Sequence, residues 1–564
     1  MFKKILRFYN TIKFLKLAQL VFFIIRRKIS TPQFQLSSET ELNLSYTSIE
    51  LQRPIPVENG ITDSNDFDFL NCKSRFDITS IDWCPLDQSR LWRYNLHYFD
   101  YLRRSNFSDV KKLGIISDWI KGNPQNSQPG WEPYTTSLRV VNWIFFINTF
   151  QSPVPPAVIN VLYSQALWLE RNDERHILAN HYFENLKALL FAACFFTGKD
   201  ADRWRKRALV EIPQQLQEQT LQDGGHYERS PQYHALMLEN YLDIYNLAIN
   251  NEDFFDDFFI QTVKIFSIRS LDFLNTIVFP DKNIPLFNDS AFNIAPSLHD
   301  LNQYAERLFS YRSSEKFITP SIINKLNSGF YGLKSATDML IMTCGDIIPA
   351  YQPGHTHCDL LSFELMMASK RVIVDTGVYE YEPGELRRYV RSTRAHNTVS
   401  VDGDEQSEIW GEFRIARRAK KHAASIKQIA DDICITGEYS GFYGDTVGFQ
   451  PRFNHHRSIN VKLVKDAIDT ITVVDKLTGK GVQRVESYVH FHPDFSAHVN
   501  DDKSVTLKCH EDDFAVLSID SHCEARIEKT IYCPEFGLKQ PIDCLVISAS
   551  GVFPLELSYR LQRR

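Results

Sequence analysis

Three polar residues interrupt one otherwise apolar segment of the chain. The segment HILANHYFENLKALLFA carries Asn180, His181 and Glu184 among aromatic and aliphatic residues. Their spacings of three and four residues put all three side chains on one face of a helix. Any one of them is explained equally well by a hydrogen-bond network between helices. Because buried polar groups cost free energy unless they are satisfied, the three together favour a functional site.

A tyrosine follows a glycine turn in LQDGGHYERSPQYHALMLENYL. The turn is residues 223–225, and Ser230-Pro231 is a helix start, with Ser as N-cap and Pro at the first helical position. Tyr233 falls in the first turn, where the positive end of the helix dipole would favour a phenolate. Tyrosine titrates near 10, so one that transfers protons needs such help. The alternative is an aromatic that packs the first turn onto the core.

A second polar cluster lies in YQPGHTHCDLLSFEL. His355, His357 and Asp359 alternate, so an extended segment would turn all three the same way. Asp375 and His396 follow downstream. Two histidines and an aspartate from separate strands are a plausible zinc set, because zinc takes imidazole and carboxylate ligands tetrahedrally. Turn residues that satisfy loop carbonyls are the alternative, and the cluster indicates a site more strongly than it indicates zinc.

Between these segments lies an arginine-rich stretch, ELRRYVRSTRAH. It contains Arg387, Arg388, Arg391 and Arg394. Guanidinium groups bind carboxylate and sulfate groups well, because their donors match two oxygens at once. A solvated surface run explains the stretch equally well.

The hydrophobic period indicates which elements position these residues. From about residue 76 to 325, apolar residues recur at three- and four-residue spacing, with short breaks carrying Pro, Gly and Asn. Successive helices without strands predict an α/α layered array or toroid. From 326 to 564 the segments are short, alternating or β-branched, and separated by turn residues. They predict an all-β domain, a β-sandwich.

Residues 1–75 are predicted to form a basic helix and an irregular arm. The longest uncharged run, Leu17 to Ile25, is too short to span a bilayer. Arg26, Arg27 and Lys28 follow at once, without a small-residue cleavage site. We expect an amphipathic helix that packs on the protein or makes peripheral contact with a membrane surface.

Composition excludes several classes of protein. The chain has 564 residues and a formal net charge of −6, so it lacks the global basic field of a nucleic-acid-binding protein. Its ten cysteines are scattered without a CxxC pair, which argues against a disulfide framework. Neither a GxGxxG nor a Walker loop is present, so we expect no organic cofactor.

An ordered set of motifs resembles the heparinase II/III-like polysaccharide lyases, an alginate lyase-like group. The set covers roughly residues 80–500 and comprises WRYNLHYFDYL, NHYFEN, DGGHYERSPQYH, GHTHCDLLSFEL and RSTRAHNTVSVDG. The resemblance implies an (α/α) toroid followed by an antiparallel β-sandwich. It also implies β-elimination at a uronic acid of an acidic polysaccharide, in capsule or exopolysaccharide metabolism.

The resemblance also implies roles for single residues. Asn180 and His181 are similar to groups that neutralise the uronate carboxylate, Tyr233 to the tyrosine that acts as acid and base, and His355 to a catalytic histidine. A structural zinc would be held by His357, Asp375 and His396. The residues expected to bind substrate are Glu184, Tyr227, Arg391 and Arg394, and Tyr227 also competes with Tyr233 for the catalytic role.

Other functions remain open from the sequence alone. A uronate C5-epimerase needs the same groups as a lyase. A non-catalytic polysaccharide-binding protein would be expected to have lost Asn180, Tyr233 or His355, which are all present. An inverting glycosidase needs two carboxylates, for which Glu184 and Glu228 are candidates. The family resemblance implies the cell envelope or periplasm, and the lack of a clean signal peptide leaves the cytoplasm as the alternative.

Overall fold

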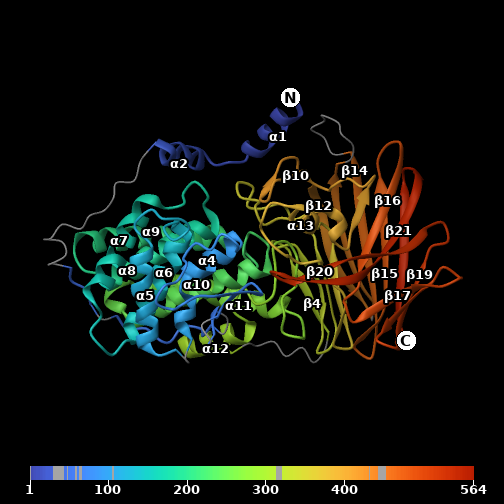
Figure 1. Cartoon of the computed structure of the whole chain (residues 1–564). Coiled ribbons are helices and arrows are strands. Elements are labelled where there is room, and N and C mark those ends of the chain that lie inside the picture. The colour runs from blue at the N-terminus through green and yellow to red at the C-terminus, as the bar shows by residue number, and fades with distance from the viewer. Residues whose placement is uncertain are drawn as a thin grey trace.

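The protein divides into a helical half and a β-rich half. The computed structural model describes residues 2–28, 44–47, 49–57, 60–62, 66–104, 107–312, 320–430, 432–442 and 452–564. Helices α4 (Arg90–Tyr98) to α12 (Leu298–Phe309) lie on one side, strands from β4 (Ser321–Lys325) onward lie on the other, and the two halves meet along one face (Figure 1). The predicted order of a helical domain followed by a β-domain is confirmed.

The helical half is a set of consecutive helices around an aromatic core. Trp92, Trp119, Trp143 and Trp204 are fully buried there, and the rings of Trp119 and Trp143 pack edge to face with centroids 5.6 Å apart. Such aromatic pairs stabilise beyond the area that they bury. The helices are α4 (Arg90–Tyr98), α5 (Asp109–Gly122), α6 (Pro133–Thr149), α7 (Pro156–Asn172), α8 (Ala179–Phe195), α9 (Lys199–Gln219), α10 (Pro231–Asn250), α11 (Asp257–Ile277) and α12 (Leu298–Phe309).

Two helices carry the predicted site residues. In α8 every residue is buried except His181, so this helix runs through the interior and exposes one position. Helix α10 begins as the sequence predicts: Ser230 is the N-cap, its side chain accepts from the Tyr233 backbone N–H, and Pro231 opens the helix. The cap satisfies an N–H group that would otherwise lack a partner. Both helices therefore present their first turns to the site.

The β-rich half contains three large sheets, and all of their strand pairings are antiparallel. The first sheet is a five-stranded meander in which β5, β6 and β7 are buried throughout. Eight strands form the second sheet in the order β12-β13-β14-β15-β22-β19-β18-β17, and the third has the order β20-β21-β16-β9. Strands β13 and β15 alternate buried and less buried positions, as expected for strands with one face on a core.

The strand bounds place the turns between them. In the meander they are β4 (Ser321–Lys325), β5 (Phe330–Lys334), β6 (Met339–Thr343), β7 (Phe363–Met367) and β8 (Lys370–Ile373). The other sheets contain β9 (Val399–Val401), β12 (Lys420–Ile429), β13 (Asp432–Gly441), β14 (Phe453–Val464), β15 (Ala467–Thr478), β16 (Val482–His490), β17 (Phe495–Val499), β18 (Val505–Cys509), β19 (Asp512–Ile519), β20 (Glu524–Glu535), β21 (Leu538–Val552) and β22 (Leu555–Arg563). A short helix, α13 (Glu385–Val390), and a hairpin of β10 (Ile409–Trp410) and β11 (Arg414–Ile415) lie between them.

The domain boundary lies a few residues before the predicted one at 326. Helix α12 ends at Phe309, and β4 begins at Ser321 and pairs with β5. Ser321–Lys325 is a strand because it pairs with β5 across the next turn. The local change of hydrophobic period does not show this pairing, so it does not mark where the strand begins. The prediction was therefore late by one strand.

The N-terminal arm is more ordered than predicted. Helices α1 (Phe2–Ile12) and α2 (Leu17–Lys28) replace the single basic helix, and residues 29–43 of the arm lie outside the described residues. A small sheet of β1 (Gly60–Ile61), β2 (Asp66–Phe69) and β3 (Cys72–Arg75) follows. The buried rings of Phe67 and Phe69 pack on Tyr101 and Trp92 of the helical domain, which explains why the segment is ordered.

Candidate active site

Three of the four predicted catalytic residues meet where the helical half contacts the β-rich half. The Asn180 amide donates to both carboxylate oxygens of Glu228, at 3.2 and 3.3 Å. His355 Nε2 lies 3.5 Å from Glu228 Oε2. The Tyr233 ring stacks on the His355 ring with centroids 3.8 Å apart. The start of α8, the start of α10 and a loop of the β-domain thus build one polar cluster.

The phenol of Tyr233 is held in its protonated form. Burial raises the pKa of Tyr233 well above its ordinary value, and the neighbouring Tyr381, Asp289 and Glu228 raise it further. The Tyr233 hydroxyl lies 3.3 Å from that of Tyr381. The expectation that the helix dipole would favour the phenolate is therefore wrong in direction, because loss of hydration and nearby negative charge outweigh a partial charge at the helix end. In the free protein this tyrosine is suited to donating a proton.

His181 lies beside this cluster and carries a raised pKa. Burial alone would lower the pKa of His181, but the charge and hydrogen bond of Glu174 raise it above its ordinary value, with a further contribution from Glu228. Its Nδ1 is 3.1 Å from Glu174 Oε1, and its ring packs on that of Tyr134. The side chain is 30% exposed, so the imidazole is accessible to an anionic ligand, and the raised pKa favours its protonated form.

Asp289 is the residue that the sequence did not reveal. Its carboxylate is fully buried and receives His355 Nδ1 at 2.9 Å, His357 Nε2 at 2.7 Å and both terminal nitrogens of Arg387. Burial alone would raise the pKa of Asp289, but the Arg387 charge and the two histidine hydrogen bonds hold it well below its usual range. In the sequence Asp289 stands in FNDS, a turn-like stretch without any other signal.

The bond to Asp289 fixes which nitrogen of His355 faces the site. Since an ionised carboxylate only accepts, Nδ1 carries the proton, and Nε2 is turned toward Glu228. The segment from His355 to Asp359 forms a loop and not the extended strand considered for it, so its two histidines converge on one carboxylate. In the sequence Arg387 is one of four arginines in the arginine-rich stretch. In the structure it is the arginine whose guanidinium binds the Asp289 carboxylate.

Glu228 lies at the centre of the polar cluster, whereas the sequence suggested it only as a carboxylate of a glycosidase. Burial raises the pKa of Glu228, while His355 and His181 oppose the shift. Glu184, the other carboxyl considered, accepts from Asn240 within the helical core and is buried. The two carboxyl groups have different partners, since Glu184 is held by Asn240 and Glu228 by Asn180.

The residues expected to bind substrate have different surroundings. Arg391 is 1% exposed and donates to the carbonyls of Gly411 and Thr356, which leaves it no exposed guanidinium for a ligand. The side chain of Arg394 is 59% exposed and pairs with Glu528. Tyr227 is buried and shares a hydrogen bond with Tyr351. The neighbouring loops occupy both terminal nitrogens of Arg391, and its direct contact with substrate stays a prediction.

The predicted zinc ligands lie near one another without forming a ligand shell. The rings of His357 and His396 are 5.3 Å apart, and His396 Nδ1 is 2.8 Å from Asp375 Oδ2. His357 Nδ1 and His396 Nε2 are buried without a partner among the described residues. Within that part of the chain, however, the structure brings together no group of three His, Cys, Asp or Glu side chains that could hold a metal ion. Zinc therefore stays a prediction, and elemental analysis of the purified protein tests it, with about one zinc per chain expected if the site is occupied.

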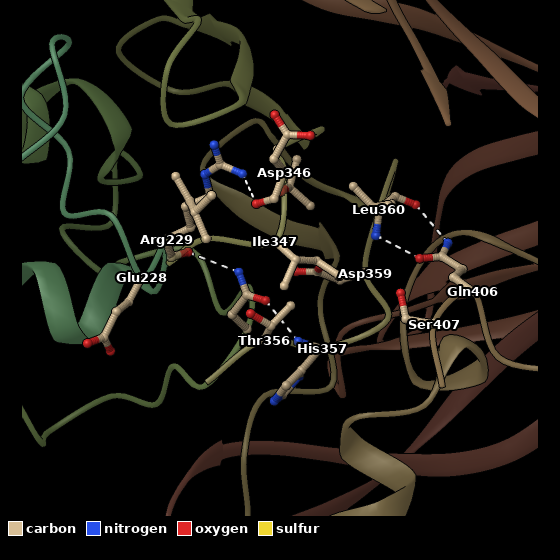
Figure 2. A pocket seen from close by; sticks show the side chains of 14 residues that line it. Glu228, Arg229, Asp346, Ile347, Thr356, His357, Asp359, Leu360, Gln406 and Ser407 are labelled. Carbon is tan, nitrogen blue, oxygen red and sulfur yellow. Dashed lines mark hydrogen bonds between the residues drawn. The ribbon is translucent and has the colours of Figure 1, made fainter. Parts of the chain in front are cut away.

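A small cavity lies on the β-domain side of the cluster (Figure 2). Its volume is about 20 Å³, which is enough for a water molecule and far too small for a sugar. Asn288 joins its two walls: its amide donates to the Arg229 carbonyl, and its side-chain oxygen accepts from the His357 backbone N–H. Asn288 thus ties the loop that carries His355 and His357 to the segment before α10.

Family models match most of the chain. The heparinase II/III N-terminus model matches residues 112–317, and the heparinase II/III-like C-terminal model matches residues 319–559. The chain belongs to the heparinase II/III family. The two matched segments meet between α12 and β4, where the structure also changes from helices to strands.

Curated relatives in this family include heparin-sulfate lyases. The chain is 28% identical over 318 residues to the heparin-sulfate lyase of Pedobacter heparinus, a match to 51% of this chain and 47% of that protein. It is 24% identical over 349 residues to the heparin-sulfate lyase of Bacteroides stercoris, covering 56% of this chain and 50% of the relative. The matches thus span about half the length of these curated relatives.

Solved structures confirm the architecture. A crystal structure of heparinase III aligns with a TM-score of 0.67 at 15% identity, covering 97% of this chain and 89% of the other. A heparan sulfate lyase from Pedobacter heparinus aligns with a TM-score of 0.60 at 19% identity, covering 89% of this chain and 81% of the other. The predicted helical toroid followed by an antiparallel β-sandwich is the fold of this family.

Proposed function

We propose that this protein is a polysaccharide lyase that cleaves a uronic-acid-containing acidic polysaccharide by β-elimination. The observation that carries the proposal is the cluster in which Tyr233 stacks on His355 beside the Asn180–Glu228 pair. The family membership and the heparin-sulfate lyases among the relatives support it.

The cluster supplies a group for each step of the elimination. Removal of the proton at C5 of the uronate leaves an electron pair that forms the C4–C5 double bond, while the C4–O4 bond breaks and O4 takes a proton. His355 Nε2 is the base, since Nδ1 is bound to Asp289. Tyr233 is the acid, since the raised pKa keeps its hydroxyl protonated. A base and an acid held side by side in this way are what the elimination needs.

The uronate carboxylate must be neutralised before its C5 proton becomes acidic enough to remove. Charge develops on this carboxylate in the transition state, so donors aimed at it lower the barrier. Asn180 offers its amide, and protonated His181 offers a charge. Burial raises the pKa of Glu228, which favours its neutral form and so reduces its repulsion of the substrate carboxylate. Glu228 lies beside His355 and accepts from Asn180, and the charge of His181 acts on the same carboxyl.

The activity is tested with a panel of uronic-acid polysaccharides. Elimination leaves an unsaturated sugar end that absorbs in the near ultraviolet, and we expect such absorbance to rise with at least one polymer of the panel. Proton exchange at C5 without new absorbance would identify a C5-epimerase instead. Binding without either change would identify a non-catalytic polysaccharide-binding protein.

Tyr233→Phe tests the assignment of the acid. The substitution keeps the ring that stacks on His355 and removes only the hydroxyl, so we expect turnover to fall by roughly a hundredfold or more with folding retained. Tyr559→Phe is the control, because its hydroxyl is buried in the sandwich without a described partner. Full activity in Tyr233→Phe would exclude the proposed role, and loss of activity in Tyr227→Phe alone would move the role to Tyr227.

A further inference from the structure

The exposed apolar side chains of the protein gather on its two N-terminal helices. Of the 22 large hydrophobic side chains that are exposed in the described part of the chain, nine lie in residues 5–25. They are Ile5, Phe8, Tyr9, Leu17, Leu20, Val21, Phe23, Ile24 and Ile25. A helix that merely packs on its own protein turns such residues inward, so an outward apolar face indicates a partner.

The same two helices are strongly basic. Residues 1–28 contain eight Lys and Arg and no Asp or Glu, although the whole chain has a formal net charge of −6. Positive charges that flank an exposed apolar face are the composition of a helix that lies in the interface of an anionic bilayer. An acidic polysaccharide would match the charges but not the aliphatic and aromatic side chains.

Polar contacts hold the helices on the two domains. On the β-domain side, Arg7 of α1 pairs with Glu408, and Thr11 accepts from Trp410 Nε1. On the helical side, Gln19 of α2 donates to the Ile177 carbonyl. Figure 1 shows the pair along one edge of the molecule, with α2 over the helical half and α1 beside β10. These contacts fix the pair on both domains, while the nine apolar side chains and basic residues such as Lys3, Lys4 and Arg26 stay exposed.

The connection between the helices adjoins the candidate site. Lys16 pairs with Glu218, and its ammonium lies 4.2 Å from the centre of the Tyr351 ring. Tyr351 donates to Glu218 and shares a hydrogen bond with Tyr227. This chain of contacts links the helix pair to the segment that precedes Glu228.

We propose that α1 and α2 form one membrane-docking face that binds an anionic lipid surface and is held by both domains. Each helix is short, and no single described helix is long and apolar enough to cross a membrane. The two helices are bent by 106° at the break between them. The helices lie in the interface with their apolar side chains among the acyl chains and their lysines and arginines at the headgroups. The enzyme would then act on polysaccharide next to a membrane.

Flotation of the full chain with lipid vesicles tests the proposal. We expect binding to phosphatidylcholine vesicles that contain about one third phosphatidylglycerol, weaker binding to pure phosphatidylcholine, and a loss of binding at high salt. Phe8→Ser with Val21→Ser should weaken vesicle binding by at least about tenfold, since two apolar side chains no longer enter the bilayer. Phe258→Ser with Val210→Ser is the matched control, because these exposed residues of the helical domain lie outside the proposed face and should change nothing.

Three outcomes would overturn the proposal. One is equal vesicle binding by the Phe8→Ser, Val21→Ser protein and the wild type. Another is binding of soluble acidic polysaccharide through these helices without binding to vesicles, which would assign the basic face to the substrate. The third is a concentration-dependent dimer that the same pair of substitutions abolishes in protein that does not bind vesicles, which would assign the apolar face to a second copy.

Discussion

At the scale of single residues, Asp289 organises the site although it touches no reacting atom in the proposed mechanism. It holds His355, His357 and Arg387 with one buried carboxylate. A histidine that acts as a base needs a defined tautomer and orientation, and a carboxylate on Nδ1 provides both. Asp289 is therefore a positioning residue for His355.

Asp289→Asn should lower kcat by roughly a hundredfold or more, because a histidine base without its carboxylate partner takes the wrong tautomer. The amide has the shape of the carboxylate but no longer selects one tautomer of His355. Since the change affects the base and keeps the shape of the site, KM should change little. Asp475→Asn is the matched control, since Asp475 is a buried carboxylate held by Arg457 and His455 in the sandwich. Both variants should lose stability, and kcat should fall only in Asp289→Asn. Equal kcat values for the two folded variants would contradict the positioning role.

The pH dependence of catalysis should report on His181. Its pKa is raised by Glu174, so the charged imidazole persists below that raised value and is lost as the pH rises through it. The stability from the pair follows the same sign: it is complete below the unfolded pKa near 6.5 and disappears as the pH rises through the folded value.

Glu174→Gln should therefore move the descending alkaline limb of kcat/KM to lower pH. The substitution removes the charge that stabilises the imidazolium while keeping a side chain of the same size. The measurement is the pH profile of kcat/KM for both proteins, with thermal unfolding at each pH to confirm that they stay folded. An alkaline limb at the same pH in both proteins would show that His181 does not titrate in this range as a substrate-binding group.

At the scale of elements, the first turns of α8 and α10 carry the site, and Ser230 connects α10 to the loop that bears Asp289. Its hydroxyl caps α10 at the Tyr233 N–H and also lies 2.6 Å from the Asp289 carbonyl oxygen. The Ser230 side chain thus fixes the positions of both the helix that bears Tyr233 and the loop that bears Asp289. This explains why the N-cap that the sequence predicts lies next to the catalytic cluster.

Ser230→Ala should cost about 1 kcal/mol of stability through the lost cap and should also lower kcat. Ser297→Ala is the matched control, because Ser297 caps α12 at Asp300, outside the cluster. We expect a similar fall in the free energy of unfolding for both variants, measured by urea denaturation, and a fall in kcat for Ser230→Ala alone. Unchanged kcat in Ser230→Ala would separate the cap from catalysis.

At the scale of the whole molecule, the site exists only while the two halves stay together. Arg229, which precedes α10, donates to the carbonyls of Asn327 and Asp346 in the β-domain. Asp223 accepts from both the backbone N–H and the hydroxyl of Ser328. Burial lowers the pKa of Arg229 to about 10, so it remains charged at neutral pH in a dry junction.

Arg229→Met should loosen this junction. It leaves the carbonyls of Asn327 and Asp346 without their charged donor, and hydrogen bonds to charged groups contribute about 1.5–3 kcal/mol each. We expect thermal unfolding by calorimetry to separate into two transitions, one for each half, where the wild type shows a single one. Arg203→Met is the control, since Arg203 is an exposed residue paired with Glu170, and it should leave the transition unchanged. A single transition at the wild-type temperature in Arg229→Met would contradict the role of this contact.

The amino-acid sequence by itself determined the features that depend on local pattern. The change of hydrophobic period predicted the two halves, and Ser230-Pro231 predicted the start of α10. The ordered motifs identified Asn180, Tyr233 and His355, which the fold then brings together. These features were predictable because helix periodicity, capping and motif order are properties of neighbouring residues.

Only the tertiary structure decided the features that depend on contacts between distant segments. Asp289 looks like a turn residue until the fold turns two histidines and an arginine toward it. Arg391 looks like its neighbours in the arginine run, yet it is buried on backbone carbonyls. The pKa of Tyr233 rises where the helix dipole alone predicts a fall, because burial acts more strongly than a helix end. The burial of a side chain and the charge around it depend on every segment that packs near it in the fold. The spacing of residues along the chain therefore does not predict them.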